Sequence, residues 1–179
     1  MKKQELRRIG KFALYGAIGF GIGGGVAGGL FMDIGYYSDW FLLGFIAFGA
    51  IGGLALGLAL KDWIRAILLV FFGAIATLIG FVLGRIIFGP VDFAYSYFEI
   101  TVIWGIIGGA IGGTAVGLVS AELSFWILTL AGAIGFGIGM VIATPVDHWY
   151  KWALVGIIGG AFLGAALGYL EKRKTKSHS

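Results

Sequence analysis

Three short elements, each with an aspartate three residues before a tyrosine, are the best candidates for a shared chemical site. They read Asp33-Ile-Gly-Tyr36, Asp92-Phe-Ala-Tyr95 and Asp147-His-Trp-Tyr150. Residues three apart on a helix or a turn edge point the same way. Three carboxylates gathered at one outer mouth would attract cations, as acidic rings do in cation pathways. In the alternative interpretation, which we weight more heavily, each Asp caps a helix and each Tyr anchors at a membrane interface.

Arg85 is the one charged residue inside an apolar stretch, close to the outer end of the third stretch. An ionisable residue inside a membrane span is a functional hypothesis by default. Its simpler role is to reach the lipid headgroups or to pair with Glu99 or Asp92. The sharper hypothesis makes Arg85 a gate or an anion contact beside the same outer mouth.

Few residues in the chain could support catalysis, metal binding or phosphate binding. The histidines are His148 and His178, and the chain has no cysteine. No cluster offers the three or four ligands that a metal site needs. The Gly-rich stretches lie inside apolar segments and are not followed by Gly-Lys-Ser/Thr, which excludes a phosphate loop. We therefore expect no catalytic residues, no cofactor and no bound metal, and we predict that the protein is not an enzyme.

The composition is that of a membrane protein. The chain has 179 residues, of which 59% are hydrophobic and 12% are charged. A spanning helix needs about 20 mostly apolar residues. Six stretches fit, separated by short charged segments, and they predict an all-α protein with six transmembrane helices. The predicted spans are Phe12–Met32, Phe41–Leu60, Ala66–Phe88, Ile100–Val119, Phe125–Thr144 and Trp152–Leu170.

Glycine makes up 34 of the 179 residues, against an average of about 7%. In the even-numbered spans it recurs every fourth residue, which makes a nearly straight groove along one face of a helix. Helices in lipid associate through such small-residue faces by van der Waals contact. The predicted helix-packing residues, in a glycine-zipper arrangement, are Gly49, Gly53, Gly57, Gly105, Gly109, Gly113, Gly156, Gly160 and Gly164. Packing within the chain is the simpler role for them, and self-association is the alternative.

Two glycine patterns alternate three times along the chain. The odd-numbered spans carry related runs that begin at Gly16, Gly73 and Gly132. The even-numbered spans share the frame Gly-x-Ile-Gly-Gly-x-x-x-Gly, beginning at Gly49, Gly105 and Gly156. With the Asp-x-x-Tyr elements recurring in phase, they predict three tandem helical hairpins around a pseudo-three-fold axis, within a single membrane domain. The predicted repeats cover about 5–60, 62–119 and 122–170, followed by a basic tail at 171–179.

Gly19, Gly21 and Gly23 form a Gly-x-Gly-x-Gly run that resembles the rotor hairpins of rotary ATPases. That resemblance implies tight hairpin packing. Ion translocation by those rotors depends on a mid-membrane carboxylate in the second helix of the hairpin. The second, fourth and sixth spans here have no Asp or Glu in their interiors. We therefore keep the resemblance as one of packing and reject it as one of function.

Charged residues divide unequally between the two sides of the predicted membrane. The side with both termini carries eleven Lys and Arg against four Asp and Glu, and the other side carries two against five. Because cytoplasmic segments are enriched in Lys and Arg, we predict that both termini are cytoplasmic, in a prokaryotic plasma membrane. The basic ends would bind anionic lipid. This distribution speaks against nucleic-acid binding.

On function the sequence supports two classes. The first is a scaffold or assembly component that packs against itself or against a partner membrane protein. The alternative is a small channel or transporter with its path along the pseudo-three-fold axis. The lack of polar residues in the middle of the spans favours the first. An axis filled by apolar side chains would support scaffolding, and polar side chains around an open axis would support transport.

Overall fold

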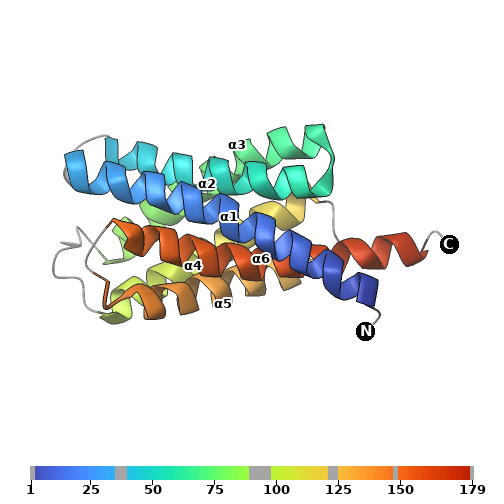
Figure 1. The fold of residues 1–179 in the computed structure, drawn as a ribbon. Helices are drawn as coiled ribbons and strands as arrows, with labels where there is room; N and C mark the ends of the chain where they lie inside the picture. Colours follow the sequence, from blue (N-terminus) through green and yellow to red (C-terminus); the bar gives the residue numbers. More distant parts are fainter. Residues whose placement is uncertain (1–2, 35–39, 89–97, 121–124, 147–148, 178–179) are drawn as a thin grey trace.

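The computed structural model is an all-helical bundle (Figure 1). It describes residues 3–34, 40–88, 98–120, 125–146 and 149–177, without the side chains of 31–34, 40–41, 85, 88, 98–100 and 172–177. In these ranges the helices are α1 (Lys3–Ile34), α2 (Trp40–Leu60), α3 (Trp63–Phe88), α4 (Phe98–Val119), α5 (Phe125–Ala143) and α6 (Tyr150–Ser177).

Each of these six helices is long and apolar enough to cross a membrane, which confirms the predicted number of apolar helices. The fold is thus compatible with a multi-pass membrane protein. The helices extend beyond the predicted spans at their polar ends: α1 begins at Lys3, and α6 runs to Ser177. Most of the predicted tail at 171–179 is therefore helical. Lys, Arg and Glu are good helix formers, so the apolar helices continue through their charged flanks.

The six helices form a closed ring. Each helix packs against its neighbours in the chain, and the most extensive contact joins α1 to α6. Figure 1 shows the start of α1 and the end of α6 at the same end of the bundle, here named the terminal end. We name the opposite end, where α2, α4 and α6 begin, the distal end. Helices joined by short connections therefore run antiparallel around a common core.

The turn between α2 and α3 lies at the terminal end. Lys61 has a φ of 58°, the left-handed conformation with which many helices end. The backbone N–H of Arg65 donates a hydrogen bond to Asp62 Oδ1 (3.1 Å), so Asp62 caps the first turn of α3. These two local features reverse the chain within two residues.

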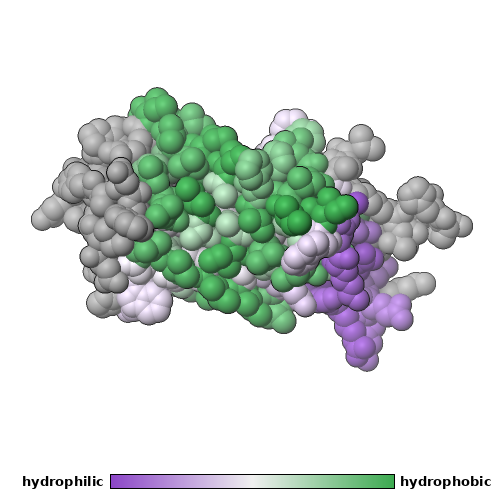
Figure 2. Space-filling view, turned by 90° about the horizontal axis from the view of Figure 1, so that it is seen from above, coloured by the Kyte–Doolittle hydropathy of each residue, from purple (hydrophilic) through white to green (hydrophobic). Residues whose placement is uncertain are grey.

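Apolar side chains cover the body of the bundle, as Figure 2 shows, and polar residues gather at the terminal end. The exposed apolar residues lie on every helix and include Ile18, Leu58, Ile67, Ile106 and Ile134. Such a surface suits lipid and would be costly in water.

Candidate functional site

Glycine backbones form the closest contacts between helices. A Cβ atom placed on Gly16 of α1 would fall on the carbonyl group of Gly160 of α6, and one placed on Gly160 would fall on the carbonyl group of Gly16. The same reciprocal contact joins Gly49 to Gly73 and Gly109 to Gly132. A side chain at any of these positions would push two backbones apart, so only glycine fits.

All nine predicted helix-packing glycines lie where an added Cβ would meet a neighbouring helix. Gly53 faces the carbonyl of Leu69, and Gly113 faces the carbonyl of Leu128. The remaining contacts pair Gly57 with Ala66, Gly105 with Phe136 and Met140, Gly156 with Phe20, and Gly164 with Phe12. Each even-numbered helix therefore uses its glycine row against the following odd-numbered helix, with α1 following α6.

Three phenylalanine rings meet at the centre of the bundle. The ring centroids of Phe20 and Phe48 lie 5.5 Å apart, those of Phe20 and Phe136 also 5.5 Å, and those of Phe48 and Phe136 5.8 Å. All three pairs are edge to face, the favoured geometry for aromatic rings. We call these residues the Phe triad. They come from α1, α2 and α5, and they fill part of the middle of the bundle with apolar atoms.

On the terminal side of the Phe triad the core is packed with leucine. Leu56, Leu69, Leu128, Leu163 and Leu167 have at most 1% of their surface exposed. An ion-pair cluster lies beyond them: Glu171 of α6 binds Arg8 of α1 at 3.6 Å and Arg65 of α3 at 3.4 Å. Since α3 and α6 lie on opposite sides of the ring, this cluster ties the two sides together at the terminal end.

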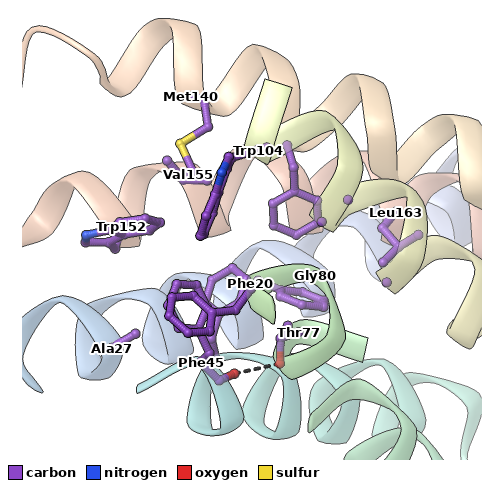
Figure 3. A pocket seen from close by; sticks show the side chains of 17 residues that line it. Phe20, Ala27, Phe45, Thr77, Gly80, Trp104, Met140, Trp152, Val155 and Leu163 are labelled. Atoms are coloured by element: carbon purple, nitrogen blue, oxygen red, sulfur yellow. Dashed lines mark hydrogen bonds between the residues drawn. The ribbon is translucent and has the colours of Figure 1, made fainter. Parts of the chain in front are cut away.

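Beside the Phe triad, whose three rings help to line it, the packing leaves a cavity of about 70 Å³ (Figure 3). Side chains from all six helices line it. Phe45, Phe81 and Trp104 form an aromatic wall, with Phe45 and Phe81 4.8 Å apart and Phe81 and Trp104 5.7 Å apart between ring centroids. The lining also includes Phe20, Ala27, Phe48, Thr77, Gly80, Gly108, Gly112, Phe136, Met140, Trp152, Val155 and Leu163.

The polar atoms of this lining are few. The hydroxyl of Thr77 lies 2.7 Å from the backbone oxygen of Phe45, to which it donates a hydrogen bond. No charged residue is among the lining residues. The cavity therefore offers space and mainly apolar contact.

The cavity exists because α3 carries the small side chain of Thr77 at the position where α1 and α5 carry phenylalanine. Phe20 and Phe136 each stand four residues after a glycine of a reciprocal pair, and Thr77 has the same place after Gly73. The ring of Phe20 covers Gly52 of α2, and the ring of Phe136 covers Gly159 of α6. Thr77 has no ring to place over α4, and Gly108 and Gly112 of α4 have no atom within 4 Å of an added Cβ.

Most of the predicted outer-mouth site lies outside the described residues. Tyr36, Asp92, Tyr95 and Asp147 fall in undescribed segments, while Asp33, Arg85 and Glu99 lie in helices without described side chains. Tyr150 is described, as the exposed first residue of α6, with its ring 5.9 Å from that of Trp149.

Neither the Phe triad nor the cavity was predicted from the sequence. A usable signal was present: two of the three odd-numbered glycine runs reach Phe four residues after their first glycine, and the third reaches Thr77. Comparisons with protein-family models, with curated proteins and with solved structures find no match for this chain.

Proposed function

We propose that this protein is a membrane scaffold or assembly component that packs against itself or against a partner membrane protein. The Phe triad carries the proposal. A path along the axis would have to pass three mutually packed rings and a leucine-filled core. A conducting pathway needs polar groups that replace the hydration shell of an ion, and these layers supply hydrocarbon.

We further propose that the bundle consists of three tandem hairpins joined by glycine-zipper contacts. The support is that the reciprocal glycine pairs recur at α6–α1, α2–α3 and α4–α5. In these pairs Gly49 of α2 is equivalent to Gly109 of α4 and Gly160 of α6. The repeated sequence pattern instead makes Gly49 equivalent to Gly105 and Gly156. The difference is one helical turn, which a row with glycine at every fourth position absorbs without losing contact.

Among the described apolar windows, that of α3 is the least buried in the bundle and leaves the most room for a partner. Only 28% of the apolar window of α3 is buried in the bundle, against 50% for α6. Exposed aromatic and aliphatic side chains follow its outer face: Trp63, Ile64, Ile67, Phe71, Phe72, Ile79 and Ile86. We propose this face as the partner-binding surface.

The test is purification in native nanodiscs, followed by mass spectrometry of the intact complex. We expect a second copy or a partner in fixed stoichiometry. The double variant Phe71→Ala/Phe72→Ala should no longer bind this second copy or partner. The matched variant Ile134→Ala/Ile138→Ala on α5 should still bind it. Proteoliposomes should pass ions no faster than protein-free vesicles. A monomer that conducts ions would overturn the proposal and establish the channel alternative.

A further inference from the structure

We propose that the cavity beside Thr77 is a binding site for a single hydrocarbon chain of a membrane lipid. This site goes beyond the scaffolding role and does not depend on it. The observations that carry it are the extent of the cavity lining along the bundle, the chemistry of that lining and the reason for the existence of the cavity.

The residues that line the cavity extend along the bundle. Its lining on α6 runs from Trp152 to Leu163, which at about 1.5 Å per residue is about 16 Å along the helix. A cavity of about 70 Å³ whose lining extends along the bundle suits part of an elongated apolar guest such as a hydrocarbon chain. Ala27 and Trp152 mark its distal part, and Leu163 and Gly112 lie at its deep part.

Water is the wrong occupant. The volume exceeds the roughly 10–15 Å³ that one water molecule needs, but a buried water also needs two to four polar partners. The hydroxyl of Thr77 already donates to the Phe45 backbone oxygen at 2.7 Å. Apolar cavities of this kind stay dry and take up apolar guests. In a lipid bilayer the most concentrated apolar guest is the hydrocarbon chain.

The size of residue 77 controls the space. Thr77 stands where the equivalent positions of α1 and α5 carry Phe20 and Phe136, whose rings cover glycines of the neighbouring helix. Thr77→Phe is therefore a variant that fills the cavity with a ring this fold already accepts twice. Thr77→Val is its matched control, since it removes the hydroxyl and keeps the space.

Two tryptophans allow binding in the cavity to be measured by fluorescence. Trp104 lines the cavity and is 9% exposed, while Trp126 on α5 is 65% exposed. The probe is 9,10-dibromostearic acid, whose bromines quench tryptophan fluorescence on contact, added to the protein in a non-denaturing detergent. One set of variants keeps Trp104 as the sole tryptophan and the other keeps Trp126, with Phe at the remaining tryptophan positions. Circular dichroism verifies that each is folded.

With Trp104 as reporter we expect saturable quenching in the Thr77 and Thr77→Val backgrounds. Thr77→Phe should weaken the apparent affinity at least about tenfold, because several methylene groups lose their place. Quenching of Trp126 should rise with probe concentration without saturating, and Thr77→Phe should leave it unchanged. Relief of Trp104 quenching by stearic acid would identify an acyl chain as the occupant, and relief by farnesol would identify an isoprenyl chain. Trp104 quenching that does not saturate, or that Thr77→Phe leaves unchanged, would overturn the proposal.

Discussion

Gly16 of α1 and Gly160 of α6 lie backbone against backbone, each facing the carbonyl of the other, although they come from opposite ends of the chain. This contact closes the ring of helices. It repeats the arrangement of Gly49 with Gly73 and of Gly109 with Gly132, whose helices are adjacent in sequence. The first and last helices thus use the same kind of surface as helices joined by a turn.

Gly160→Val should destabilise the fold. An added side chain would meet the backbone of α1, which cannot move without separating the two helices, and overpacking typically costs about 1–3 kcal/mol. Unfolding in mixed micelles with increasing sodium dodecyl sulfate measures the change. Gly10→Ala is the control, because an added Cβ there has nothing within 4 Å, and it should stabilise α1 by about 0.5–1 kcal/mol. Equal effects of the two substitutions would contradict this packing.

Thr77→Phe should raise the stability of the bundle. Removing a void recovers about 24 cal/mol per Å³, so a cavity of about 70 Å³ corresponds to about 1–2 kcal/mol, less the lost Thr77 hydrogen bond. Phe136→Ala should act in the opposite direction by about 3–5 kcal/mol, since it enlarges the same space. Thermal unfolding in detergent measures both. A Thr77→Phe variant that unfolds at lower temperature would show that the ring does not fit over α4.

Glu171→Gln should loosen the terminal end. The carboxylate of Glu171, whose side chain is 15% exposed, binds both Arg8 and Arg65. Its loss should cost about 1 kcal/mol, because the two arginines stay partly exposed and water screens them. The difference from the native chain should shrink in high salt. Arg7→Gln, at an exposed position of α1, serves as the control, and a salt-independent loss would argue against ion pairing.

Asp62→Ala should remove the cap of α3. The Asp62 carboxylate accepts a hydrogen bond from the Arg65 backbone N–H and lies 3.2 Å from the Arg65 guanidinium. Loss of an N-cap costs about 0.5–2 kcal/mol. Asp62→Asn keeps the acceptor and should recover most of the loss. If Asn and Ala are equally destabilising, the ion pair and not the cap is responsible.

The predicted orientation is open to a labelling test, because the chain has no native cysteine. Lys3→Cys and Lys61→Cys should react with a membrane-impermeant maleimide from the cytoplasmic side only. Pro145→Cys, at an exposed position of the distal end, should react from the opposite side only. The excess of Lys and Arg at the terminal end is the physical basis of this prediction. Labelling in the reverse sense would overturn it.

The sequence alone determined that the protein is a bundle of six apolar helices. Hydrocarbon cannot satisfy backbone N–H and C=O groups, so long apolar segments must be helical whatever their other contacts. Glycine at every fourth residue marks one side of a helix, and this local pattern was the basis for predicting the helix-packing glycines. Helix ends were less well predicted: charged flanks such as that beginning at Lys3 continue the helix, and apolarity does not show where they stop.

Only the tertiary structure decided which helices meet and what fills their centre. The pairing of Gly16 with Gly160, the Phe triad and the contact of Glu171 with Arg65 join residues from distant parts of the chain. Glycine rows allow several registers one turn apart, so sequence spacing could not choose among them. The large side chains, packed to a density that leaves few voids, select one register. They leave a cavity where Thr77 stands in place of the rings of Phe20 and Phe136, and only the packed structure shows that this difference opens a space.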